Sequence, residues 1–185
     1  SFAQQRLWFL DQLEGPSAVY TVRLPVRWNG PLDFDVLQRA VDAVVARHES
    51  LRTIFENRGG EPVQIVVSDV EVPVQRHDCV GMQTEDVFAA VGKLSRVPFA
   101  LATGPLVRVH MLRLGDDQYL LLLLCHHIVS DAWSSGVLFS DLARAYDALA
   151  AGEDLPFEAL PVQYADYAVW QRLERQVLAG GQCVI

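Results

Sequence analysis

The sequence contains few cysteines and no long hydrophobic run. The three cysteines, Cys79, Cys125 and Cys183, are odd in number and widely separated, so we expect no disulfide framework and reduced thiols in a cytoplasmic protein. No apolar run approaches the roughly 18 residues of a membrane-spanning helix. The sequence also does not open with a charged segment followed by an apolar one, the pattern of a signal peptide. We therefore expect neither a membrane span nor a signal peptide.

Basic residues are also scarce. The chain has 15 Lys and Arg against 23 Asp and Glu, which gives a net charge of −8, and no basic run is available to follow a phosphate backbone. Nucleic acid and acidic membrane surfaces are thus not expected as partners. The 185 residues, 51% of them hydrophobic, are enough for one globular domain with a sizeable core.

Hydrophobic periodicity and turn residues predict an α/β domain. The expected helices cover residues 4–13, 33–49, 84–94, 134–152 and 162–178, and the expected strands cover 20–28, 51–55, 62–67, 70–76, 106–114 and 119–124. Pro25 favours an edge position for the first strand. We expect Gln4 and Arg6 on the solvent-exposed side of the first helix, and His110 at a half-exposed strand position.

The stretch around His126 and His127 is the strongest candidate for chemistry. Residues 119–124 are uniformly apolar and predict a strand buried on both faces, so two imidazoles follow directly at its exit. Burial disfavours imidazolium, which favours a neutral histidine able to accept a proton, and Asp131 could orient the ring. Packing histidines with satisfied hydrogen bonds are an equally reasonable interpretation. A metal site is a third, although no further histidine or Cys-x-x-Cys completes a ligand set.

Four stretches, in order, carry a resemblance to a known family. Residues 1–8 (SFAQQRLW), 47–55 (RHESLRTIF), 126–131 (HHIVSD) and 164–170 (YADYAVW) resemble the first four sequence motifs of nonribosomal peptide synthetase condensation domains. HHxxxD alone is weak evidence, whereas four ordered motifs are strong. The resemblance covers essentially the whole chain, and the later motifs of the family are absent.

The resemblance implies a fold and a reaction. Condensation domains consist of two lobes resembling chloramphenicol acetyltransferase, each with a mixed sheet packed with helices, and the active site lies in a tunnel between them. Residues 1–185 correspond to the N-terminal lobe, without the C-terminal lobe. The implied reaction is amide-bond formation between aminoacyl or peptidyl thioesters on the phosphopantetheine arms of donor and acceptor peptidyl carrier proteins. No tightly bound cofactor and no metal is implied, and neighbouring synthetase domains are expected partners.

The resemblance also assigns roles to residues. His127 matches the catalytic histidine, a general base or the group that positions the amine. His126, Arg52 and Trp170 match positions of structural support. Asp131 matches an aspartate that holds the loop through an arginine, for which Arg47 or a residue of the missing lobe is a candidate.

One residue next to the motif departs from the family pattern. Ala132 replaces the glycine that follows the motif aspartate; if this position requires a positive φ, its methyl group causes strain of roughly 1 kcal/mol, and it could narrow the channel for the pantetheine arm. Trp133 is expected to be exposed on the surface that faces the missing lobe. Residues 15–20 resemble members that use a donor ending in a D-residue more than those that use an L-residue.

Three other functions remain alternatives to peptide-bond formation. One is a catalytically silent recruitment or docking module of a synthetase, which Ala132 favours and the intact His126, His127 and Asp131 disfavour. The others are a related epimerisation domain and an acyltransferase with the same histidine motif. We expect the isolated lobe to fold but to be inactive alone, because a tunnel requires a second wall.

Overall fold

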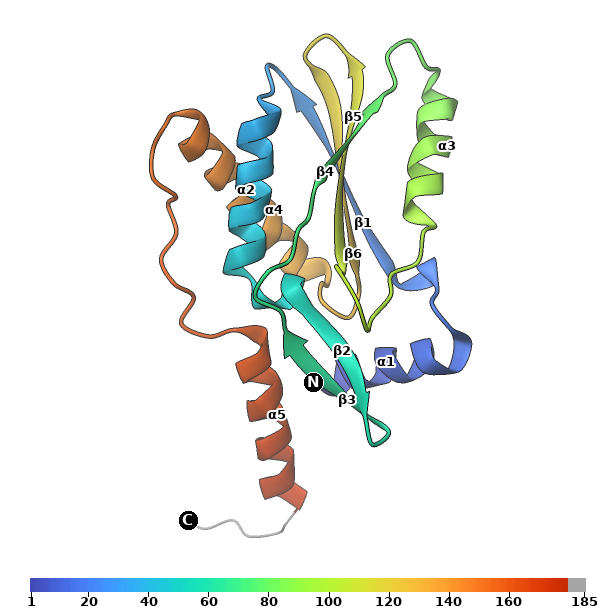
Figure 1. Cartoon of the computed structure of the whole chain (residues 1–185), viewed down its shortest axis with the longest axis vertical. Helices are drawn as coiled ribbons and strands as arrows, with labels where there is room; N and C mark the ends of the chain where they lie inside the picture. The colour runs from blue at the N-terminus through green and yellow to red at the C-terminus, as the bar shows by residue number, and fades with distance from the viewer. Residues whose placement is uncertain (180–185) are drawn as a thin grey trace.

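The computed structural model describes residues 1–179 and confirms a mixed α/β architecture (Figure 1). The helices are α1 (Phe2–Glu14), α2 (Phe34–Arg47), α3 (Thr84–Ser95), α4 (Ala132–Ala150) and α5 (Tyr164–Ala179). The strands are β1 (Thr21–Asn29), β2 (Thr53–Arg58), β3 (Glu61–Val66), β4 (Val74–Asp78), β5 (Val107–Gly115) and β6 (Gln118–His126).

The four-stranded sheet places the apolar strand in its interior. Its order is β1-β6-β5-β4, in which β4 runs parallel to β5 and the other neighbours are antiparallel. The predicted buried strand is thus confirmed as β6, and Pro25 lies on the edge strand β1, where an absent N–H costs no interior ladder bond. Strands β2 and β3 form a separate hairpin.

Side chains on both faces of β6 are buried because helices cover both faces of the sheet. Leu121, Leu123 and Cys125 pack against α2 and α4, whereas Leu122 and Leu124 pack in a second cluster with Trp8 of α1 and the apolar side of α3. Figure 1 shows α2 and α4 on one side of the sheet and α3 on the other. This double coverage explains why the sequence of β6 shows no alternation.

The structure corrects two burial predictions. Gln4 is buried rather than exposed, although Arg6 is exposed as expected. His110 is also buried, with 3% of its surface exposed, and its Nδ1 lies 3.1 Å from His77 Nε2. Burial lowers the pKa of His110 to about 4. Both residues lie under elements far away in sequence, which alternation within one segment cannot reveal.

Several element boundaries also differ from the predictions. The strand expected over 51–55 is β2 and runs from Thr53 to Arg58, because Glu49–Arg52 form a short 3₁₀ helix. Helix α4 begins at Ala132 instead of Ser134 or Ser135, because Asp131 is its N-cap. The strand expected over 70–76 begins only at Val74, where the chain meets β5.

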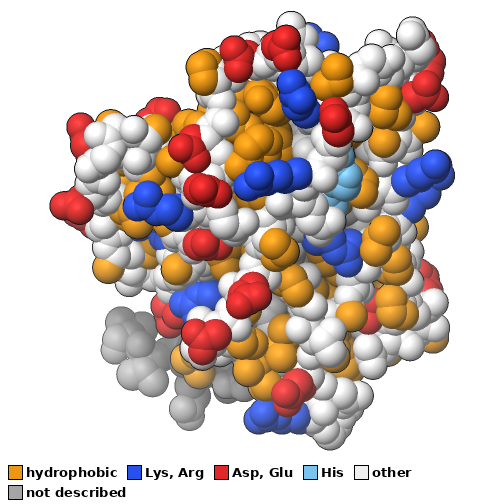
Figure 2. Space-filling view, turned by 45° about the horizontal axis from the view of Figure 1, so that its top comes forward, with side chains coloured by type: hydrophobic (Ala, Val, Ile, Leu, Met, Phe, Trp, Pro, Cys, Tyr) orange, Lys and Arg blue, Asp and Glu red, His pale blue; other side chains and the backbone are white. Residues whose placement is uncertain are grey.

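The surface mixes charged and apolar groups, and two of the three thiols are buried. On the face shown in Figure 2, acidic and basic side chains are interspersed with exposed hydrophobic ones. Cys79 and Cys125 are buried free thiols, and burial raises the pKa of Cys125 to about 12; Cys183 lies outside the described residues. Within residues 1–179, no helix is both long and apolar enough to cross a membrane.

Candidate active site

His126 ends β6 and supports the loop that follows. Its ring is 1% exposed, and its Nδ1 accepts a hydrogen bond from the Ile128 N–H at 3.1 Å. Burial, with a smaller contribution from the charge of His127, lowers the pKa of His126 to about 4. His126 is therefore neutral at pH 7 and supports the backbone, in agreement with the structural role that the resemblance implies.

His127 turns the other way, toward solvent. Its backbone N–H donates to the Tyr20 carbonyl at 2.8 Å, which fixes the start of the loop to the segment before β1. Its side chain is exposed and lines a cavity of about 330 Å³. Of the two histidines at this strand end, only His126 is buried as expected; His127 is exposed.

The cavity beside His127 brings together residues from all four motif stretches. Gln4 comes from α1, Ser50 from the segment after α2, and Tyr164 from the first turn of α5. The remaining lining residues come from α1, the loop after β6 and the start of α4: Ala3, Leu7, Ile128, Val129, Ser130, Asp131, Trp133 and Ser134. Stretches from both ends of the described chain and from its middle therefore form one pocket around one exposed imidazole.

Asp131 caps a helix and forms no ion pair with Arg47. Its Oδ1 accepts from the Ser134 N–H at 2.8 Å, and its own N–H donates to Ser134 Oγ at 2.7 Å, a reciprocal capping box. The hydrogen bond from the Ser134 backbone lowers the pKa of this exposed carboxyl. Arg47 is therefore wrong as the partner of Asp131 in this structure, and an arginine of the missing lobe stays a prediction.

Ala132 does not cause the expected strain. It is the first residue of α4, and among the non-glycine residues of 1–179 only Asp117 has a positive φ. Its exposed methyl group does not belong to the cavity lining. A glycine is thus not required here by backbone conformation.

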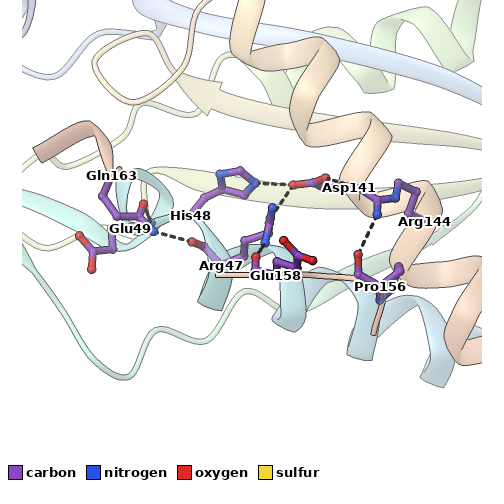
Figure 3. Close-up of polar contacts among 8 residues, drawn as sticks. All are labelled: Arg47, His48, Glu49, Asp141, Arg144, Pro156, Glu158 and Gln163. Carbon is purple, nitrogen blue, oxygen red and sulfur yellow. Dashed lines mark hydrogen bonds and ion pairs between the residues drawn. The ribbon is translucent and has the colours of Figure 1, made fainter. Parts of the chain in front are cut away.

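Arg47 binds a different aspartate, Asp141 in the middle of α4 (Figure 3). Arg47 Nε lies 3.0 Å and His48 Nε2 2.8 Å from the same Asp141 Oδ2, and Arg144 NH1 lies 3.8 Å from the other oxygen. Asp141 is buried, so the guanidinium groups of Arg47 and Arg144 compensate a carboxylate that has left water. The cluster joins the end of α2 to the middle of α4.

Three other predicted site residues have distinct surroundings, and only one of them lines the cavity. Trp133 lines the cavity and is 85% exposed, as expected. Trp170 is exposed on α5 and stacks on Tyr167 at 5.8 Å between ring centroids. Arg52 is removed from the cavity: its NH1 donates to the Val67 carbonyl at 3.1 Å, which supports a structural role.

A larger cavity does not contain the candidate chemistry. It measures about 410 Å³ and lies between α2 and the segment before β4, with Gln38, Asp42, Arg52 and Glu71 among its lining residues. None of the histidines lines it. Volume alone therefore does not select a candidate site, and the convergence of the four stretches favours the smaller cavity as the candidate. No group of three or more His, Cys, Asp and Glu side chains suited to a metal ion occurs within the described 179 residues.

Two residues that contact Arg47 were not predicted from the sequence. Asp141 interrupts the apolar side of α4 next to Leu142, and a charged residue at such a position is a usable signal of a buried ion pair. Gln163 donates from its Nε2 to the Arg47 carbonyl at 3.0 Å and accepts from the Glu49 N–H at 3.2 Å. The sequence offers no comparable signal for Gln163, since a glutamine before a helix is ordinarily solvated.

The sheet order and the helices on both faces define a lobe with the chloramphenicol acetyltransferase-like fold. The family model of the condensation domain matches residues 1–179, and the chain belongs to that family. It is 44% identical over 177 residues to malpibaldin synthetase of Mortierella alpina, covering 93% of this chain and 3% of that protein.

Two solved structures extend the comparison to three dimensions. The first condensation domain of the CDA synthetase superposes with a TM-score of 0.83 at 26% identity, covering 94% of this chain and 45% of that one. The X-domain in its complex with OxyB from teicoplanin biosynthesis gives a TM-score of 0.86 at 28% identity, covering 96% and 38%. The chain thus spans less than half of either solved chain.

Proposed function

We propose that this chain is the N-terminal lobe of a condensation domain that forms peptide bonds in nonribosomal peptide synthesis. The observation that carries the proposal is the exposed imidazole of His127 at a cavity to which all four family motifs contribute. The loop is held by the Tyr20 carbonyl and the neutral His126 ring. These hydrogen bonds fix the backbone that carries the His127 imidazole.

The proposed chemistry is attack of an amine on a thioester. The acceptor nitrogen forms a bond to the donor carbonyl carbon, the carbon–sulfur bond breaks, and the donor's phosphopantetheine leaves as a thiol. His127 accepts the amine proton or orients the amine for attack. A placed base is typically worth about 10²- to 10⁴-fold in rate, and alignment of two tethered substrates supplies the larger remaining part.

The substrates and partners follow from the same proposal. Aminoacyl or peptidyl groups arrive on the phosphopantetheine arms of two peptidyl carrier proteins, and no tightly bound cofactor takes part. The residues 15–20 favour a donor ending in a D-residue. The buried reduced thiols Cys79 and Cys125 support a cytoplasmic location.

A second lobe is part of the proposal. This chain covers 45% and 38% of two similar solved chains, and Trp133 is almost fully exposed at the pocket. A C-terminal lobe over this face would exclude water and form the opposite wall of the substrate channel. We therefore expect the isolated chain to be inactive and activity to appear when the second half is added.

The test is dipeptide formation from two loaded carrier proteins by the complete domain. His127→Ala should lower the turnover number at least about 100-fold, whereas His77→Ala, at the sheet edge, should leave it unchanged. Normal turnover by the folded His127→Ala variant excludes a role for this side chain in the reaction.

A recruitment module is the second candidate, and the X-domain structure favours it, since that domain was solved in complex with another protein, OxyB. The same assay separates the two functions. A complete, folded domain that binds both loaded carriers without forming dipeptide supports recruitment, whereas turnover that depends on His127 supports condensation.

A further inference from the structure

Gln4 takes part in two hydrogen-bonding systems at once. As the third residue of α1 it completes a capping box: its backbone N–H donates to Ser1 Oγ at 3.4 Å, and its Oε1 accepts from the Ser1 backbone nitrogen at 2.9 Å. The other end of the carboxamide reaches out of the helix. Its Nε2 donates to the Ile128 carbonyl at 3.1 Å, one residue beyond His127.

This contact lies out of reach of bulk water. Gln4 is 4% and Ile128 3% exposed, and a buried carbonyl that loses its partner costs about 1 to 3 kcal/mol. The N–H of Ile128 is bound to the His126 ring. Both polar groups of the Ile128 backbone are therefore fixed, the N–H by the residue before His127 and the carbonyl by Gln4.

The helix cap does not explain why this residue is glutamine. A glutamate would accept the same hydrogen bond from Ser1, and its negative charge in the first turn would stabilise the helix further. A glutamate cannot donate to Ile128, however, and would place a carboxylate oxygen against a carbonyl oxygen. The amide nitrogen is needed by the loop and not by the helix.

We propose that Gln4 is a positioning residue for His127, which holds the catalytic loop by donating to the Ile128 carbonyl. This inference rests on the proposed function, because it assigns to Gln4 the placement of a side chain whose role in amide formation is itself proposed. Displacement of a catalytic group by about 1 Å can lower a rate about 100-fold, so loss of this hydrogen bond should act on turnover.

Ser1 provides the matching contrast. Its hydroxyl accepts from the Gln4 N–H and lies 3.0 Å from Tyr164 Oη, so Ser1→Ala removes the cap while the Gln4 amide remains opposite Ile128. Gln4→Glu does the reverse, since it preserves the cap and removes the donor. Gln75→Glu, the same change at an exposed position of β4, controls for the added charge.

The experiment measures dipeptide formation by the complete domain with loaded carrier proteins, together with the melting temperature of each variant. We expect Gln4→Glu to lower kcat about 10- to 100-fold at an unchanged KM for the acceptor carrier. Because a buried carbonyl loses its donor, this variant should also have a lower melting temperature, so kcat is compared at a temperature at which every variant is fully folded. Ser1→Ala should lower the melting temperature and leave kcat intact, and Gln75→Glu should change neither.

A normal kcat for Gln4→Glu, or a loss of kcat matched by Ser1→Ala, overturns the positioning role. If Gln4→Glu does not fold, Gln4→Met takes its place, because it keeps the chain length and cannot donate, and the same comparison decides. His127→Ala is measured in parallel. Normal turnover by that variant refutes the proposed function, whereas loss for His127→Ala with normal kcat for Gln4→Glu refutes only the positioning inference.

Discussion

Helix α4 carries an aspartate in each of two contrasting surroundings. Asp131, at its N-cap, belongs to the histidine motif, yet it is exposed and bonded to the helix that it precedes. Asp141 belongs to no motif, yet it is buried and contacts Arg47, His48 and Arg144 (Figure 3). The motif aspartate thus shapes the local backbone beside the pocket, and the other one joins two helices.

This difference shows that a residue's membership of a sequence motif does not determine its contribution to the stability of the fold. A carboxylate at an exposed cap replaces water as the partner of one N–H, so its net effect is modest. A buried carboxylate between cations is costly to leave incomplete, because the remaining charge has neither water nor a partner. Substitutions at the two positions should therefore differ in both size and kind.

The largest effect is expected for Asp141→Ala. It leaves the guanidinium of Arg47 largely buried and unpaired, which should lower the free energy of unfolding by about 3 kcal/mol. Asp147→Ala, on an exposed position of the same helix, is the matched control and should stay within about 0.5 kcal/mol. Equilibrium urea unfolding at pH 7 measures both, and equal values for the two variants contradict the buried ion cluster.

Asp131→Ala should cost about 1 kcal/mol, the usual value for a lost N-cap. Asp131→Asn, which can still cap, should be nearly neutral. The hydrogen bond lowers the pKa of Asp131 in the folded state, so its contribution is present above the unfolded pKa and is lost as the pH falls through the folded one. The stability curves of the native chain and Asp131→Ala should thus converge in acid; a gap that persists there argues for a different role.

The smallest effect is expected for Ala132→Gly. Since Ala132 begins a helix without a positive φ, the glycine relieves no strain and lowers stability by at most about 1 kcal/mol. Turnover of the complete domain should be unchanged. A clear gain in turnover would show that the methyl group obstructs a substrate when the second lobe is in place.

The sequence predicted those structural features that depend on residues close together in the chain. Three predictions from local patterns were confirmed: the buried strand β6 from its apolar run, the edge position of Pro25, and helix α2 from its hydrophobic periodicity. The partner of Arg47 and the burial of Gln4 and His110 depend on which distant elements cover them, and single-chain periodicity carries no such information. The motifs indicated which stretches matter, but only the fold showed that they share one cavity.

The connection between α4 and α5 has a consequence for how this lobe can vary. Residues 151–163 form no helix or strand, but Arg144 binds the Pro156 carbonyl at 2.7 Å and Arg47 binds the Glu158 carbonyl. Hydrogen bonds to main-chain oxygens do not depend on the side chain of the accepting residue, but the Phe157 ring lies 4.6 Å from the Arg47 guanidinium and packs against the core. The segment should therefore accept many substitutions at positions other than Phe157, whereas inserting or deleting a single residue would move Tyr164 away from the pocket that it lines.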